Sequence, residues 1–404
     1  MVRRPHSPTP VPESPFQAGR RLTASELVDR EAEVREVRNA LRGAGKLWVI
    51  GPRRYGKTSL VHAAREAAEA DGVVVLWVDA EAFTTVEMLA AELLAQATKR
   101  LEPRIQRAQT VVSSFFGRLR PTVGYNPGDG SFAVSLGVDA AAAGGGVPLV
   151  TDVLNGIEQW AAQTKRRVAI VIDEVQELLE KAGRTGEGQF RAAVQQHERV
   201  GYVFAGSKAR YLARVTSEPG APFFNLGSKL YVGPIPDADF LAFLASAFAH
   251  GGFALEPDAL EAILDLAQRV PYNVQLLADA CWTELSVRPP PTDAPWSATE
   301  VRATAEAMVR KLDPYYSPQW LQLSGPQRTA LLAMVREVDV GLTSGAVLQR
   351  YRLTASAMQK ALGGLLGKGV LFEEQAAGAT ELRLQDPFFG IWVRLYAAAP
   401  SLRP

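Results

Sequence analysis

The stretch that most constrains the fold of this chain is GPRRYGKTSL, residues 51–60, which separates an apolar run at 47–50 from a helical pattern. Its spacing, G-x-x-x-x-G-K-T, is that of a phosphate-binding loop, and strand, loop and helix form the context that this motif requires. Glycines let the backbone curl so that N–H groups face phosphate oxygens, and the helix presents its positive end to the same anion. We therefore expect Lys57 to reach the β- and γ-phosphates of a nucleotide and Thr58 to bind Mg²⁺.

Further apolar runs end in polar or small residues, as the strands of a parallel sheet do at the edge where ligands bind. The expected strands are 73–78 before Asp79, 168–172 before Asp173 and Glu174, 202–205 before Gly206 and Ser207, and 229–232. Helical segments alternate with these strands. The sequence therefore predicts an α/β fold in which a P-loop NTPase parallel sheet carries helices on both faces.

Two acidic residues and one hydroxyl are candidates for the chemistry. Asp173 can hold Mg²⁺ through water, and Glu174 is placed to orient and deprotonate a water aimed at the γ-phosphate. The alternative is that both acids only begin a helix, since acidic residues favour helix N-termini, but the phosphate loop upstream favours the catalytic interpretation. Ser207 can hydrogen-bond the γ-phosphate or the attacking water, or it can simply cap a helix, and both interpretations stay open.

The remaining pattern divides the chain into four segments. Residues 1–20 are rich in Pro and polar residues, which predicts a disordered tail. Residues 21–235 form the P-loop core, with a hairpin insertion at about 118–146 around an Asn-Pro-Gly-Asp-Gly turn. Residues 236–312 predict a helical lid and linker, and residues 313–404 predict a C-terminal winged helix-turn-helix.

The winged helix is predicted from three helices at 327–337, 344–351 and 355–367 and two short strands at 370–372 and 381–384. Binding to duplex DNA needs several lysines or arginines on one face. The expected recognition helix offers only a few such groups, and the wing contains three glutamates that repel phosphate; the candidate contacts are Arg350, Arg352, Gln359, Lys360 and Lys368. Docking on the ATPase core or on a partner protein is therefore as well supported as DNA binding.

The composition of the chain limits which partners, compartments and metal sites can be expected. The chain has 404 residues, 47% of them hydrophobic and 22% charged, with a formal net charge of +1, which gives no bulk attraction to nucleic acid or to a membrane. The one cysteine, Cys281, excludes an internal disulfide, and with no apolar leader at the N-terminus this favours the cytoplasm. No window resembles a membrane span, and the four histidines lack the spacing of metal ligands.

Several motifs together resemble one family. The segments LVDREAE (27–33), GPRRYGKTSL (51–60), VIDEVQ (171–176), FAGS (204–207) and PYNVQLL (271–277) are similar to those of the archaeal-type ATPases. This prokaryotic group is close to the STAND switch ATPases and to the origin-recognition branch of the AAA+ proteins. The resemblance covers nearly the whole chain from about residue 22 and implies a nucleotide-binding core, a helical lid and a C-terminal winged helix.

The resemblance also implies a set of site residues. The segment around Val28 and Arg30 borders the adenine of ATP, and Pro271 touches the base from the lid. Glu174, Lys57 and Ser207 remain the residues expected to act in catalysis, and Thr58 and Asp173 those expected to hold Mg²⁺. The residues implied to bind nucleotide are Val28, Arg30, Gly51, Pro52, Arg53, Arg54, Tyr55, Gly56, Lys57, Thr58, Ser59 and Pro271.

The chain departs from the family pattern at two places. Arg269 and Val270 stand where a glycine is expected before the lid proline, so that Arg269 either reaches the phosphates or lies at the surface. Residues 223–228, FFNLGS, lack the arginine that relatives tend to carry, which leaves Arg199 and Arg210 as weak candidates for an arginine finger. Arg53 and Arg54 match the family loop, but salt bridges to helix carboxylates explain them as well as contact with phosphate does.

The sequence therefore supports an ATP-dependent molecular switch that hydrolyses ATP slowly or on stimulation by a partner and forms a nucleotide-dependent homo-oligomer. Its winged helix would transmit the nucleotide state to duplex DNA or to a partner protein. The alternative is a DNA-binding regulator in which the nucleotide is only a structural ligand. A phosphoryl-transferring kinase fits less well, because an adjacent Asp-Glu pair suits attack by water.

Overall fold

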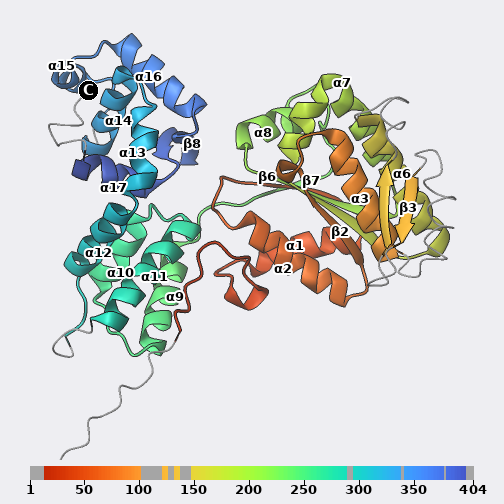
Figure 1. The fold of residues 1–404 in the computed structure, drawn as a ribbon, viewed down its shortest axis with the longest axis horizontal. Helices are drawn as coiled ribbons and strands as arrows, with labels where there is room; N and C mark the ends of the chain where they lie inside the picture. Colours follow the sequence, from red (N-terminus) through yellow and green to blue (C-terminus); the bar gives the residue numbers. More distant parts are fainter. Residues whose placement is uncertain are drawn as a thin grey trace, which may run out of the picture. The chain divides into compact units, whose positions relative to one another are not determined.

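The computed structural model describes residues 13–101, 121–125, 132–136, 147–288, 294–337, 341–376 and 379–396 (Figure 1). The chain separates into two compact units. We call Arg20–Pro234 the sheet unit, and Met1–Gly19 together with Ile235–Pro404 the helical unit. Among the described residues, none of the helices combines the length and the apolar character needed to cross a membrane.

The sheet unit alternates strands with helices along the chain. Its elements are η1 (Ala24–Glu26), α1 (Glu31–Arg42), β1 (Lys46–Ile50), α2 (Lys57–Ala70), β2 (Val74–Asp79), η2 (Ala80–Ala82), α3 (Val86–Leu101), β3 (Pro121–Tyr125), β4 (Phe132–Leu136), α6 (Val147–Thr164), β5 (Val168–Asp173), α7 (Val175–Gln196), β6 (Val200–Gly206), α8 (Ala209–Ser217) and β7 (Ser228–Tyr231).

Five of these strands form a parallel sheet with the order β2-β5-β6-β1-β7. β1, which precedes the phosphate loop, lies between β6 and β7, and β6 separates β1 from β5. Each connection between these strands passes over a face of the sheet and carries at least one helix or turn, as parallel strands require. The predicted α/β class with a P-loop NTPase-like parallel sheet is therefore confirmed.

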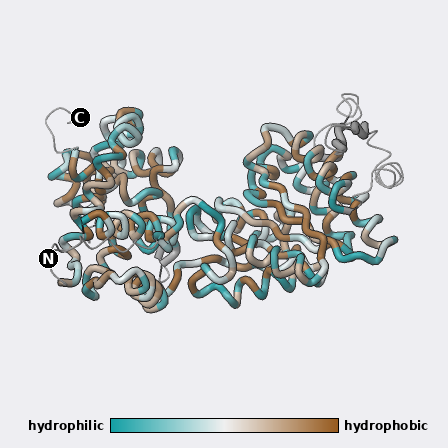
Figure 2. Tube along the Cα trace, turned by 60° about the horizontal axis from the view of Figure 1, so that its bottom comes forward, coloured by the Kyte–Doolittle hydropathy of each residue, from teal (hydrophilic) through white to brown (hydrophobic). Residues whose placement is uncertain are grey.

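Alternate residues of β1 divide between two sets of buried side chains. Trp48 and Ile50 of β1 belong to one large core cluster with α3, α6 and α7, whereas Leu47 and Val49 are buried but lie outside that cluster. Figure 1 shows α1 and α2 on one side of the sheet and α3, α6 and α7 on the other. Burial on both faces explains why β1, β2, β5 and β6 read as apolar runs, and brown segments pass through the interior of the sheet unit in Figure 2.

The predicted hairpin falls partly on described residues. β3 and β4 pair antiparallel, with Val123 opposite Val134. The expected Asn-Pro-Gly-Asp-Gly turn at 126–130 lies outside the described residues, as do 102–120 and 137–146. The boundaries of the insertion therefore stay a prediction.

In the helical unit, helices outnumber strands. Its elements are α9 (Asp237–His250), α10 (Pro257–Leu266), α11 (Pro271–Val287), α12 (Ala298–Lys311), α13 (Asp313–Leu321), α14 (Gly325–Arg336), α15 (Gly345–Tyr351), α16 (Ala355–Gly367), β8 (Leu371–Ala376), β9 (Ala379–Leu384) and α17 (Pro387–Tyr396). The predicted boundary between lid and winged helix at 312 and 313 lies inside this unit, and it stays a prediction.

The last part of the helical unit confirms the predicted winged helix. α14, α15 and α16 are followed by β8 and β9, which pair antiparallel as the wing. The sequence did not predict α17, which follows the wing. Trp392 of α17 is fully buried, stacks on Phe389, and donates a hydrogen bond from Nε1 to Asp313 Oδ1 at 2.8 Å. This helix therefore ties the end of the described chain back to α13.

The structure corrects the predicted tail for residues 13–19. The side chain of Phe16 is buried, and its ring lies 4.9 Å from that of Phe248 and 6.0 Å from that of Trp282 between ring centroids. The backbone N–H of Gln17 donates to Gln275 Oε1 at 3.1 Å. A single aromatic residue thus anchors a segment whose composition is otherwise typical of disorder, and residues 1–12 lie outside the described chain.

This anchor leads to a prediction. Replacing Phe16 with Ala leaves a cavity between α9 and α11, and we expect the helical unit to lose about 3 kcal/mol of stability. Thermal unfolding of the full chain measures the loss. Gln17→Ala is the matched control, because the hydrogen bond at that position uses the backbone N–H and survives the change. Equal melting of the Phe16→Ala variant and the wild type would contradict the proposed anchor.

Candidate nucleotide site

The phosphate loop follows β1 and is held between the ends of β6 and β7. The N–H of Gly51 donates to Gly206 O at 3.4 Å, and a Cβ at Gly51 would come within 2.5 Å of Val232 O. Gly56, at the N-cap of α2, has a φ of 83°. Glycine is therefore required at one position by close packing and at the other by the left-handed backbone.

Lys57, the first residue of α2, lies inside the loop. Its Nζ donates to Pro52 O at 2.7 Å, and the side chain is buried. Burial lowers the pKa of the ammonium to about 8, although the charges of Glu174 and Asp173 offset part of this effect. The lysine is thus a cation held in a desolvated loop, where the charge of a bound phosphate would be felt strongly.

The side chain of Thr58, at the start of α2, is hydrogen-bonded to that of Asp173, at the end of β5. Thr58 Oγ1 donates to Asp173 Oδ2 at 3.0 Å, and Asp173 is buried. Burial raises the pKa of Asp173, and the negative charge of Glu174 raises it further, whereas the Thr58 hydrogen bond lowers it. A hydroxyl and a carboxylate are the hard oxygen ligands that Mg²⁺ prefers. The pair therefore fits the predicted metal-binding role, which stays a prediction.

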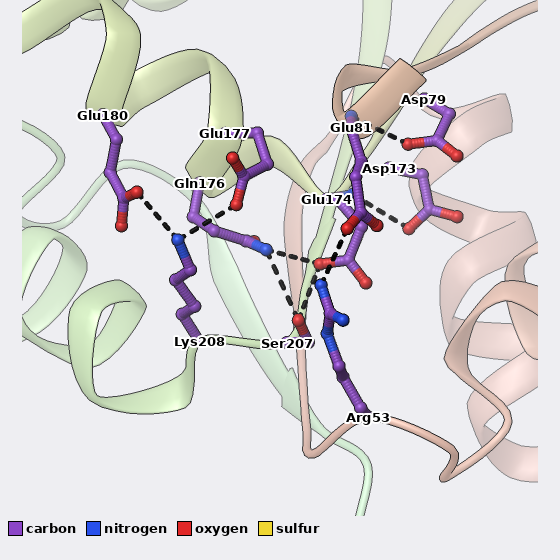
Figure 3. A network of polar contacts seen from close by, with 10 residues as sticks. All are labelled: Arg53, Asp79, Glu81, Asp173, Glu174, Gln176, Glu177, Glu180, Ser207 and Lys208. Atoms are coloured by element: carbon purple, nitrogen blue, oxygen red, sulfur yellow. Dashed lines mark hydrogen bonds and ion pairs between the residues drawn. The ribbon is translucent and has the colours of Figure 1, made fainter. Parts of the chain in front are cut away.

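A second carboxylate stands beside Asp173 in the sheet. Asp79 ends β2, and its Cα is the register partner of that of Asp173. Burial also raises the pKa of Asp79, and its Oδ1 accepts the N–H of Glu81 at 3.0 Å. Glu81 in turn forms an ion pair with Arg53 Nη2 at 2.9 Å, as Figure 3 shows. Arg53 therefore reaches away from its own loop to the segment after β2.

Glu174 lies at the junction of β5 and α7. It is the N-cap of α7 and has a left-handed backbone, with a φ of 46°. Ser207 Oγ donates to Glu174 Oε2 at 2.7 Å, and Gln176 Nε2 donates to the same oxygen (Figure 3). These bonds join the end of β5 to the end of β6, the strand that lies between β5 and the phosphate loop.

The surroundings of Glu174 favour its ionised form. Burial alone would raise the pKa, but the hydrogen bonds from Gln176 and Ser207 and the charges of Lys57 and Arg53 hold it below its usual value. A carboxylate that is ionised and oriented can accept a proton from a water molecule. The geometry thus supports the role of general base that the sequence suggested, and this role stays a prediction.

The other predicted loop residues have mixed surroundings. Ser59 Oγ accepts the N–H of Leu22 at 3.2 Å, so this hydroxyl holds the segment before α1. Tyr55 is buried, and Arg54 has a φ of 71°. Arg30 is buried, forms an ion pair with Glu33 at 2.9 Å, and donates to the Gly233 carbonyl.

The segment that was expected to border the adenine carries a shallow pocket of about 190 Å³. Leu27 and Arg30 line this pocket together with residues from the first turns of α1, and Val28 lies half-buried between them in the sequence. Whether the base of a nucleotide contacts this segment stays a prediction.

Other predicted residues lie away from the loop or in the other unit. Arg269 is at the surface of the helical unit, where it pairs with Asp237 at 2.9 Å and Asp265 at 2.8 Å. Pro271 begins α11 in the same unit. Arg199 precedes β6 and therefore stands at the amino end of the sheet, opposite the loop, whereas Arg210 is exposed in the first turn of α8. Arg199 is therefore placed away from Glu174, which lies at the carboxyl end of β5.

Sequence reasoning assigned no role to Gln176 or Glu81. Gln176 is fully buried and contacts both Glu174 and Ser207. The sequence did contain an indication for Gln176, because this residue lies on the buried face of α7 together with Val175, Leu178 and Leu179. A glutamine on an apolar helix face indicates a specific partner. Glu81 carried no such signal, since its partner Arg53 lies 28 residues upstream.

Comparisons with known proteins agree with this architecture. A family model described as an AAA ATPase domain matches residues 26–204, and one described as a probable winged helix domain matches residues 314–395. A comparison with curated proteins found no match.

Two solved structures illustrate the likeness in fold. A Walker-type ATPase of Pyrococcus abyssi is 14% identical, with a TM-score of 0.59 over 94% of this chain and 99% of that one. The ORC2 protein of Aeropyrum pernix, in ADPNP–ADP complexes, is 15% identical, with a TM-score of 0.52 over 95% of this chain and 98% of that one. At these identities the likeness shows the fold alone.

The position of Lys57 leads to a binding prediction. Lys57→Ala removes a charge-assisted contact to phosphate, and we expect ATP affinity to fall about 10- to 100-fold. Calorimetric titration of the full chain with ATP and Mg²⁺ measures the loss. Lys99→Ala, on the exposed end of α3, is the control and should bind as the wild type does. Wild-type affinity in the Lys57→Ala variant would place the nucleotide elsewhere.

Proposed function

Since the chain carries an AAA ATPase domain followed by a winged helix domain, as its motifs implied, we propose that it is a Mg²⁺-dependent ATPase that works as a molecular switch. The observation that best supports hydrolysis is the Glu174 carboxylate, held by Ser207 beside the phosphate loop. Its neighbours favour the ionised form, which is the form that a general base needs.

Binding of ATP would begin at the loop. Backbone N–H groups of the loop and of the first turn of α2 surround the phosphates, and the Lys57 ammonium neutralises part of their charge. Thr58 and Asp173 would hold Mg²⁺, which when bound withdraws charge from the phosphate oxygens. Because the lysine and the aspartate are buried before ligand arrives, little rearrangement is needed at the reacting end.

Hydrolysis would then use the end of the neighbouring strand. Glu174 orients a water molecule toward the γ-phosphate and takes its proton, and the Ser207 hydroxyl holds the carboxylate in place. Water would be the nucleophile, because an adjacent Asp-Glu pair suits attack by water rather than by a hydroxyl group of a second substrate. Turnover would be slow until a neighbouring protomer or a partner completes the site, since Arg199 stands at the opposite end of the sheet.

The switch would act on the helical unit. We propose that Pro271 senses the base and that the winged helix passes the nucleotide state to its target in a STAND-like or AAA+-like manner. A partner protein fits the winged helix better than duplex DNA does. Arg350 is paired with Glu337 at 2.7 Å, and Lys368 donates to Gln322 O at 2.7 Å. The wing adds the carboxylates of Glu374 and Glu381, which share Arg383.

The proposed hydrolysis gives the first prediction of this subsection. Glu174→Gln keeps the shape of the side chain but removes the base, and we expect kcat to fall about 10²- to 10⁴-fold with ATP affinity retained. Steady-state turnover per protomer, titrated over protein concentration with Mg²⁺, measures it, and wild-type turnover should rise as an oligomer assembles. Glu180→Gln on the same helix is the control. A Glu174→Gln variant as fast as the wild type would refute the assignment.

The charges of the winged helix give the second prediction. We expect duplex DNA to leave turnover unchanged and to bind no more tightly than a nonspecific site, with a Kd of about 10⁻⁴ to 10⁻⁶ M at physiological salt. Fluorescence anisotropy with a labelled duplex over a salt series tests this. Tight binding that weakens in Arg350→Ala and Arg352→Ala variants would instead support the alternative, a nucleotide-bound DNA regulator.

A further inference from the structure

The side chain of Gln176 is hydrogen-bonded to two candidate catalytic residues. It stands in the first turn of α7, is fully buried, and directs its Nε2 to two partners, Glu174 Oε2 and Ser207 Oγ, the latter at 3.4 Å. Ser207 donates to the same carboxylate oxygen, so that Glu174, Gln176 and Ser207 form a closed set of three side chains (Figure 3). The members come from the ends of two adjacent strands.

The amide of Gln176 has only one workable orientation. Its Oε1 is buried and has no hydrogen-bond partner among the described residues. Turning the amide over would bring that oxygen against the Glu174 carboxylate, which is an acceptor only, and would remove the hydrogen bond between them. The amide therefore donates to Glu174 and leaves its own carbonyl oxygen unpaired, which is unusual for a buried polar group.

The position of the side chain is fixed by packing on β6. A Cβ at Gly206 would come within 2.3 Å of Gln176 Oε1 and within 2.6 Å of Leu212. The glycine thus leaves the space that the glutamine fills, and a larger residue would push the amide away from Glu174. The chain holds the amide in one place although the oxygen gains no hydrogen bond there.

These contacts make the two carboxylate oxygens of Glu174 different in their hydrogen bonding. Oε2 accepts hydrogen bonds from both Gln176 and Ser207, whereas Oε1 accepts none from the described residues. An oxygen with free lone pairs is the one that can accept a proton from water. The two donors therefore select which oxygen faces the reaction and prevent the carboxylate from rotating.

We propose that Gln176 is a positioning residue for ATP hydrolysis: its buried amide clamps one oxygen of Glu174 so that the other is presented to the attacking water. This inference rests on the proposed ATPase function. In this proposal Gln176 acts through its contact with Glu174 rather than on the nucleotide or the water. Misplacement of a general base by about 1 Å can cost about 100-fold in rate.

The test replaces the donor and keeps the volume. In the full-length Gln176→Met variant we expect kcat to fall about 10- to 100-fold, with KM and Kd for ATP within twofold of wild type. The thermal midpoint should stay level or rise, because an unpaired buried oxygen is removed. Gln96→Met is the matched control: Gln96 bonds to the backbone of Trp77 in the same unit, far from Glu174 in the sequence, and its loss should spare kcat.

A double-mutant cycle separates positioning from general damage. If Gln176 acts only through Glu174, the Glu174→Gln, Gln176→Met double variant should turn over no more slowly than Glu174→Gln alone. Additive losses would overturn the proposal, as would a Gln176→Met variant with unchanged or higher kcat. A higher kcat would mean that the amide restrains Glu174.

The same series distinguishes this inference from the function on which it rests. Absent wild-type turnover, or turnover that survives Glu174→Gln, refutes the proposed ATPase mechanism and the inference with it. Wild-type turnover that is lost in Glu174→Gln but kept in Gln176→Met refutes the inference alone. Gln176→Leu, which also lacks a donor, replaces Gln176→Met if the latter fails to bind ATP, and the same loss of kcat is expected.

Discussion

The site depends on the parallel register that ends β1, β5 and β6 at one edge of the sheet. Ile50 pairs with Gly206 across β1 and β6, so the phosphate loop and Ser207 begin side by side. A helix follows each of these strands, and the N-termini of α2, α7 and α8 therefore start from the same edge. The strand order alone therefore brings backbone donors and polar side chains together at this edge.

Burial gives this edge its electrostatic character. Lys57 and Asp173 are both buried, and burial shifts the pKa of each toward its neutral form, down for the lysine and up for the aspartate. The negative charges of Glu174 and Asp173 help to keep the lysine protonated, whereas Glu174 raises the pKa of Asp173 further and the Thr58 hydrogen bond lowers it. A bound phosphate would place a negative charge beside Lys57, and Mg²⁺ would place a positive charge beside Asp173. Nucleotide binding would therefore offset the cost of burying these two charged side chains.

Local patterns were enough to predict the elements of this edge but not the contacts among them. The loop at 51–58 and the apolar strand runs depend on residues close in sequence, and the structure contains them where the sequence placed them. Phe16 and α17 were missed because their partners lie far along the chain. The clamp on Glu174 was missed for a related reason: the space for Gln176 comes from Gly206, thirty residues downstream on another strand.

Two unfavourable features meet at Glu174, and their coincidence argues for function. A left-handed backbone costs about 1–3 kcal/mol, and a buried oxygen that has no partner among the described residues, as Gln176 Oε1 has none, costs about 1–3 kcal/mol as well. Together they are a substantial part of the roughly 5–15 kcal/mol by which a typical domain is stable. An ordinary helix start would need neither. Both features hold the same carboxylate, one through its backbone and the other through its side chain. This coincidence supports the proposed role of Glu174 as the general base.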